Sequence, residues 1–111
     1  MMQAGRELDA LVAGALKGWE PGFIEHLKEN DGWILIRNYS TDWRKMGELV
    51  EEARKEEIYL EYSHALNGGY YGVSCIFKNG EYQIHHEAVE AVPTAPHAIC
   101  LAYLKAKGVS V

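Results

Sequence analysis

The sequence lacks three features that would each assign the chain to a broad class of proteins. It has no apolar run near the roughly 18 residues that a membrane-spanning helix needs. It has no low-complexity segment, which argues against long disordered regions. It has no excess of basic residues, because the formal net charge is −5. The missing apolar run means that we expect no membrane protein. An acidic surface repels phosphates, so we also expect no protein that binds a nucleic-acid backbone.

Cysteine is also rare, since Cys75 and Cys100 are the only two cysteines. The first residues, MMQAGRELDA, contain no basic segment followed by an apolar one, so we expect no secretion signal and a location in the cytoplasm. Disulfides are uncommon in that reducing compartment. We therefore expect two free, buried thiols.

What the sequence does contain is enough apolar residues for one compact domain. The 111 residues are 48% hydrophobic and 24% charged, which is typical of a single globular domain spanning residues 1–111. Apolar residues recur at helical spacing in three segments. This pattern predicts amphipathic helices at residues 5–16, 41–55 and 95–107.

Capping residues mark the start of two of these helices. Ser40 or Thr41 is the expected N-cap of the middle helix, with Asp42 in its first turn. Thr94 is the expected N-cap of the last helix. The preceding segment is harder to interpret: FIEHLKEN predicts a short helical turn, and the apolar run Trp33–Ile36 is a candidate fourth strand.

The hydrophobic period shortens from about 3.6 to about 2 residues after Glu57, which predicts strands in EIYLEYSH, YYGVSCIF and EYQIHHEA. Asn79-Gly80 lies between the last two and predicts a tight hairpin, because both positions accept a positive φ. A two-residue turn also fixes the register of the hairpin. The expected pairs are Phe77 with Tyr82, Cys75 with Ile84 and Val73 with His86 on one face, and Ile76 with Gln83 and Ser74 with His85 on a more polar face.

These elements predict an α+β fold in which an antiparallel meander of three to four strands is packed by about three helices. The last helix is apolar on nearly every side. We expect it to contact the sheet, a neighbouring helix and a second subunit. A homo-oligomer is expected because three helices and one small sheet leave apolar surface to cover.

Three segments together resemble a known family. AGRELDALVA, NYSTDW and TAPHAICLAYL, in this order, resemble the phage ABA sandwich domain family of small phage and prophage proteins. The resemblance implies helices on both faces of the sheet, an α/β/α sandwich-like arrangement, and a phage-related origin with a location in the host cytoplasm during infection. It implies no activity. The face assigned to Glu61, Ser74, Gln83 and His85 is too polar for full cover.

Candidate catalytic and metal sites have simpler explanations. His85 and His86 point to opposite faces of a strand, so with Glu87 or His64 they do not readily bind one ion. Cys100 lies on an apolar helix face, so a core thiol is the favoured interpretation over a nucleophile. Asn67-Gly68-Gly69 lacks the Lys-Ser/Thr and the following helix of a phosphate loop, so a turn is the favoured interpretation over an anion site. We expect no metal, no cofactor and no enzyme activity.

Aromatic residues lie on or beside the predicted strands and suggest a binding surface, with ordinary sheet packing as the alternative. Tyrosines on a partly polar face can stack on a base or anchor a protein interface, and arginines can bind a phosphate. The candidate ligand-binding residues are Trp43, Arg44, Tyr59, Tyr70, Tyr71 and Arg37.

Three functions remain open. The leading hypothesis is a phage-encoded, non-enzymatic counter-defence protein that sequesters a nucleotide immune signal as an oligomeric sponge. The second is an acidic inhibitor of a host defence protein complex, similar to an anti-CRISPR protein, whose interface is an acidic run on the middle helix. The third is an accessory role in the virion or its assembly. The acidic run comprises Glu48, Glu51, Glu52, Glu56 and Glu57.

Overall fold

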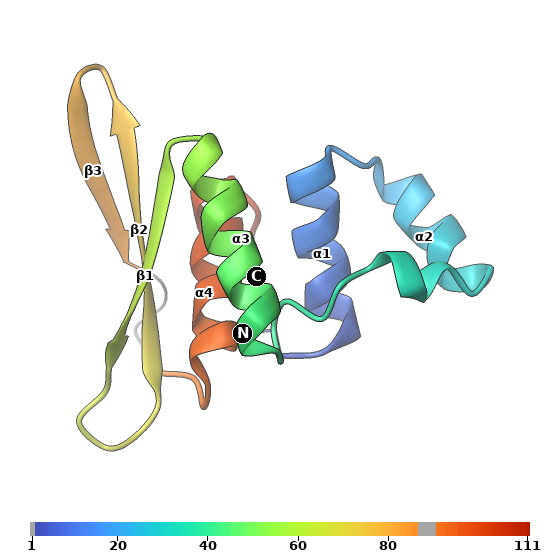
Figure 1. Ribbon diagram of the computed structural model, residues 1–111, viewed down its shortest axis with the longest axis horizontal. Coiled ribbons are helices and arrows are strands. Elements are labelled where there is room, and N and C mark those ends of the chain that lie inside the picture. Colours follow the sequence, from blue (N-terminus) through green and yellow to red (C-terminus); the bar gives the residue numbers. More distant parts are fainter. Residues whose placement is uncertain (1, 87–90) are drawn as a thin grey trace.

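The computed structural model describes residues 2–86 and 91–111, which form four α-helices, one short 3₁₀ helix and a three-stranded sheet (Figure 1). The predicted α+β fold is confirmed, and each of the three predicted helices is found within two residues of its expected bounds. The elements are α1 (Arg6–Lys17), α2 (Pro21–Glu29), η1 (Gly32–Leu35), α3 (Trp43–Lys55), β1 (Ile58–His64), β2 (Tyr70–Lys78), β3 (Glu81–His86) and α4 (Ala95–Ala106). None of the helices in this described part is long and apolar enough to cross a membrane.

The sheet is antiparallel with the strand order β1-β2-β3, so β1 and β3 are its edges. The predicted hairpin is confirmed, because Asn79 and Gly80 have φ angles of 54° and 79° and every expected cross-strand pair of β2 and β3 is present. A longer loop joins β1 to β2. It is closed by the N–H of Ala65, which donates to the carbonyl of Gly69 at 3.1 Å.

The two faces of the sheet are the reverse of what polarity suggested. The face that carries Phe77 points outward and leaves that ring 39% exposed, whereas Ser74, on the opposite face, is fully buried. Glu61 pairs with Val73 and therefore belongs to the outward face, not to the face of Ser74. The physical reason is the size of the side chains that face α4. This helix lies so close to β2 that an added Cβ on Gly72 would overlap the carbonyl oxygen of Ala98. On β2, the small residues Gly72 and Ser74 mark the face on which the helix packs.

The helices lie on one side of the sheet (Figure 1). α3 and α4 contact the strands, α1 packs against α4, and α2 packs against α1 and η1. In the described residues this is a stack of sheet and helices, in place of the helices on both faces that the family resemblance implied. Contacts inside one chain account for the broad apolar surface of α4, since Ile99, Leu101 and Tyr103 are all at most 1% exposed.

Capping at α3 differs from the prediction. The N-cap is Asp42, whose carboxylate accepts hydrogen bonds from the N–H groups of Arg44 at 2.7 Å and Lys45 at 3.3 Å. Ser40, predicted as a possible cap, is instead fully buried, and its N–H donates to the carboxylate of Asp9 at 2.8 Å. This bond joins α1 to the segment that leads into α3. At α4 the predicted cap is confirmed, because the Thr94 hydroxyl accepts from the N–H of His97 at 3.3 Å.

The predicted fourth strand at Trp33–Ile36 is wrong, because most of this run forms the 3₁₀ helix η1. The chain turns at Asp31, which has a positive φ of 55°. Ile34 is 90% exposed, so the run is not the buried strand that its composition suggested. The Trp33 ring instead lies beside α1, with the Arg6 guanidinium 5.1 Å from its centroid.

Candidate functional site

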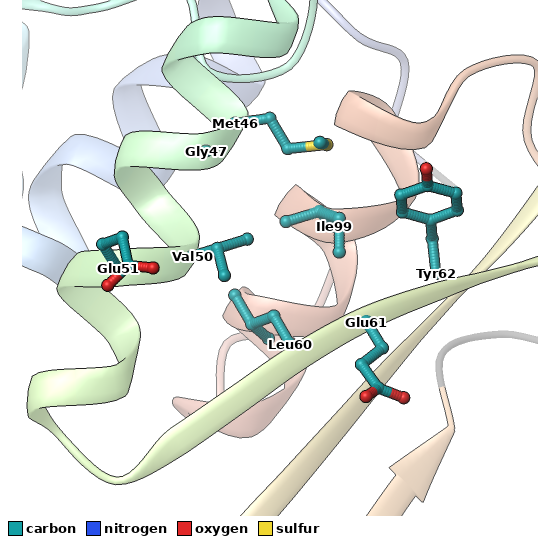
Figure 2. A pocket seen from close by; sticks show the side chains of 8 residues that line it. All are labelled: Met46, Gly47, Val50, Glu51, Leu60, Glu61, Tyr62 and Ile99. Carbon is teal, nitrogen blue, oxygen red and sulfur yellow. The ribbon is translucent and has the colours of Figure 1, made fainter.

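An open groove lies between α3 and the edge strand β1, and a residue of α4 forms part of its floor (Figure 2). Its volume is about 440 Å³. This is within the range of sites that bind small ligands, roughly 300–1,000 Å³. The groove is lined by Met46, Gly47, Val50 and Glu51 from α3, Leu60, Glu61 and Tyr62 from β1, and Ile99 from α4.

The floor of the groove is apolar and its rim is charged. Ile99, Leu60 and Met46 are 1%, 6% and 9% exposed, so little of their surface meets solvent. Two exposed carboxylates lie beside the groove: Glu51 on α3, and Glu61 on β1, whose side chain points to the opposite side of the strand (Figure 2). A ligand with apolar groups and a positive charge therefore matches the groove better than an anion does.

The groove runs along backbone groups that no other described strand pairs with, because β1 is an edge of the sheet. The N–H of Phe77 donates to the carbonyl of Glu57 at 3.3 Å, which marks residue 57 as a position bonded to β2. Bonded positions alternate along an antiparallel ladder, so the N–H and C=O groups of the odd-numbered residues of β1 point toward β2. The N–H and C=O groups of Leu60 and Tyr62 therefore point to the open edge, and the side chains of the same two residues line the groove.

Gly47 is a glycine in the middle of α3 that the fold of the chain does not require. Its φ is not in the positive region, and an added Cβ would meet no atom within 4 Å. A glycine inside a helix costs roughly 1 kcal/mol of stability relative to alanine. Since Gly47 lines the groove, the missing side chain widens it and allows another molecule to approach the α3 backbone.

Four aromatic side chains, which we call the aromatic cluster, gather around Tyr62: Trp43, Tyr62, His64 and Tyr70. The Trp43 ring lies edge-to-face with Tyr62 and Tyr70, at centroid distances of 5.8 and 6.5 Å. Trp43 is 51% exposed and Tyr62 is 38% exposed. Exposed rings with polar edges are typical of protein interfaces. The aromatic cluster thus extends the apolar surface of the groove at its Tyr62 end.

The six residues predicted to bind a ligand do not form one site. Trp43 and Tyr70 meet in the aromatic cluster, and Arg44 follows Trp43 along α3. Trp43 and Tyr70 are the part of the prediction that the structure brings together.

The other three predicted residues lie elsewhere. Tyr59 and Tyr71 belong to the outward face of the sheet, where Tyr59 packs edge-to-face against Tyr82 at 5.7 Å. Arg37 lines a separate small cleft with Tyr39 and residues of α1 and α3. The prediction grouped residues by chemical type, and strand alternation separates the neighbours Tyr70 and Tyr71 onto opposite faces.

The candidate catalytic residues have structural roles. Cys100 is fully buried, and burial raises the pKa of its thiol well above its usual range, which makes it a poor nucleophile. Both cysteines are free, although Cys75 is only half-buried, on the outward face. The Asn67-Gly68-Gly69 segment forms the turn between β1 and β2.

The histidines considered as metal ligands are His64, His85 and His86. In residues 2–86 and 91–111, no group of three or more His, Cys, Asp or Glu side chains is placed to hold a metal ion. Glu87 lies outside the described residues, and so do the side chains of His85 and His86.

None of the residues that line the groove is among the six predicted to bind a ligand. Met46 and Val50 fit the apolar stripe of the middle helix, and Leu60 fits the inward side of a strand, so all three were interpreted as core. The available signal was Gly47, a helix-weakening residue within an otherwise strong helical pattern.

Comparisons with protein-family models, with curated proteins and with solved structures find no match for this chain. The resemblance to the phage ABA sandwich domain family therefore stays a prediction. The phage origin and the counter-defence context that depend on it stay predictions as well.

Proposed function

We propose that this chain is a non-enzymatic binding protein that holds an extended segment of a partner protein along the open edge of β1. The observation that carries this proposal is that two features occur together at Leu60 and Tyr62. These residues direct to the edge backbone groups that no strand of the described residues pairs with, and their side chains line an apolar groove beside it. Strand addition uses this combination: main-chain hydrogen bonds provide affinity, and pockets for alternate side chains provide specificity.

The position of Gly47 supports the same function independently. A residue that lowers helix stability, at a position where an added Cβ would meet no other part of the chain within 4 Å, is explained when a partner occupies the space beside it. The exposed rings of Trp43 and Tyr62 add a surface of the kind that anchors partner segments.

The acidic run proposed from the sequence as an inhibitor interface has less support. Three of its five glutamates form ion pairs within α3, including Lys45–Glu48 at 3.2 Å and Lys55–Glu52 at 3.0 Å. Glu56 accepts a hydrogen bond from the hydroxyl of Tyr103 at 2.9 Å and pairs with Lys107 at 2.9 Å. Inhibition of a host protein complex remains compatible with our proposal, with the groove as the contact surface.

A nucleotide signal is the second candidate ligand, and the half-exposed ring of Trp43 favours it because a base can stack there. Arg44, next in sequence, supplies a charge for phosphate. The groove itself argues against this candidate, because its charged lining residues, Glu51 and Glu61, are both acidic. The homo-oligomer that a sponge requires also stays a prediction.

The experiment that tests strand addition uses peptides as the probe. The protein is immobilised and a displayed library of random peptides is selected against it. Selected peptides are then measured against wild type, Gly47→Leu and Lys55→Leu. The first variant places a leucine in the groove, and the second places one on an exposed part of the same helix outside it. We expect Gly47→Leu to weaken binding at least about tenfold and Lys55→Leu to leave it unchanged.

Hydrogen exchange distinguishes strand addition from simple burial of a side chain. The amides of Leu60 and Tyr62 point to the open edge, so we expect them to exchange quickly in the free protein and slowly with peptide bound. The proposal is wrong if no peptide is selected, or if the selected peptides bind Gly47→Leu equally well and leave both amides exchanging quickly.

The nucleotide candidate has its own test. Titration calorimetry with cyclic oligonucleotides and cyclic ADP-ribose isomers measures binding directly, and Trp43→Ala is the variant that should abolish it. An absence of heat with all of these ligands at high protein concentration removes this candidate.

A further inference from the structure

We infer that the partner segment has a basic residue between two apolar residues, and that Glu61 selects the basic one. This inference rests on the proposed function and adds the chemistry of the partner. It follows from the alternation of side chains along β1 and from the charges on each side of that strand.

The two outer positions of this motif follow from the groove. Leu60 and Tyr62 point toward α3 and α4, while Glu61 points to the opposite side of the strand (Figure 2). A strand paired with β1 alternates in the same way, so its residues beside Leu60 and Tyr62 also point into the groove. The surface that they meet consists of Met46, Val50 and Ile99, which accommodates apolar side chains.

The central position follows from Glu61. A partner residue beside it points to the outward face, within about 4.5–5.5 Å between Cβ atoms. The neighbour of Glu61 on β2 is Val73, and no cation pairs with this carboxylate in the described residues. A lysine or arginine on the partner supplies the missing positive charge. Glu51, also at the groove rim, already pairs with Arg54 at 3.6 Å, so Glu61 is the carboxylate that selects the basic residue.

The same charges disfavour a second copy of this chain as the occupant. When two β1 strands pair about a two-fold axis between their Glu61 residues, the two Glu61 carboxylates lie directly opposite one another. Like charges on opposed strands destabilise the pairing. A different, basic partner strand therefore fits this edge better than self-association does.

The test reverses the charge of Glu61. Peptides selected against wild type are sorted by the residue between their two apolar anchors, and their affinities are measured for wild type, Glu61→Lys and Glu29→Lys. Glu29, an exposed residue of α2 away from the groove, is the matched control, because this substitution changes the net charge equally. We expect Glu61→Lys to weaken basic-centred peptides about tenfold and to strengthen acidic-centred ones, with Glu29→Lys close to wild type.

The outcomes separate this inference from the proposed function. The inference is overturned if selected peptides show no preference for a basic centre, or if Glu61→Lys and Glu29→Lys behave alike. Loss of binding in Gly47→Leu, with protected Leu60 and Tyr62 amides, would still support strand addition in that case. A dimer that forms through β1 without peptide, detected by light scattering and abolished by Gly47→Leu, would also overturn it.

Discussion

Gly72 in β2 lies so close to Ala98 in α4 that an added Cβ would overlap the Ala98 carbonyl oxygen and approach the Cβ of Ala102 to 3.0 Å. This contact sets the distance between the sheet and its main covering helix. α4 in turn supplies Ile99 to the floor of the groove. The packing of Gly72 therefore supports the candidate site as well as the core.

We predict that Gly72→Ala destabilises the protein by about 1–3 kcal/mol, the usual cost of overpacking a core. The obstacle is backbone, which cannot rotate away as a side chain can. Urea unfolding followed by circular dichroism measures this loss. A variant as stable as wild type would show that α4 does not pack as closely as described.

We predict the opposite sign at Gly47. Gly47→Ala places a Cβ in open space within a regular helix, so the free energy of unfolding should rise by up to about 1 kcal/mol. The same urea titration checks this, with Gly72→Ala as the contrasting substitution. A destabilised Gly47→Ala would indicate a packing requirement that contradicts our functional explanation of this glycine.

The pairing of Asp9 with Ser40 predicts a pH dependence. Asp9 is 4% exposed, and burial raises the pKa of its carboxyl, although the hydrogen bonds from Ser40 oppose the shift. The folded chain then holds this proton to higher pH than the unfolded chain does, so the contribution of Asp9 to stability falls as pH rises through its folded pKa.

Asp9→Asn removes that ionisation. We expect the unfolding free energy of the variant minus that of wild type to become more positive as the pH rises from about 4 through the raised folded pKa of Asp9. Urea titrations of both proteins at several pH values provide the measurement. A constant difference across this range would mean that Asp9 titrates alike in the folded and unfolded chains.

The two thiols should react very differently in the folded protein. Cys75 is partly exposed on the outward face, whereas Cys100 is fully buried. We expect a thiol reagent to label Cys75 rapidly and Cys100 only after unfolding, as mass spectrometry of the labelled peptides would show. Equal labelling of both cysteines in native conditions would contradict the placement of α4 in the core.

The sequence was sufficient for much of the local structure, although not for the run Trp33–Ile36 or for the N-cap of α3. The Asn79-Gly80 turn predicted the hairpin and its register, because few backbone conformations join two strands in two residues. Thr94 and the apolar stripes located the helices for an equally local reason. These predictions depend on residues near one another in the chain.

Predictions that depend on distant residues succeeded less often. The inward face of the sheet is decided by the approach of α4 to Gly72 and Ser74, which the strand pattern alone does not contain. Ser40 is buried because Asp9, 31 residues away, accepts its N–H. The groove is missed for the same reason: its walls come from α3, β1 and α4, and no local pattern reports their spacing.

The burial of α4 on all sides also has a consequence for the order in which the chain folds. α4 is the last described element, yet it contacts α1, α3 and the strands. During synthesis the earlier helices and the sheet are made first, with no common partner to pack against. We expect the domain to acquire its structure in a single late step, once the residues of α4 have left the ribosome.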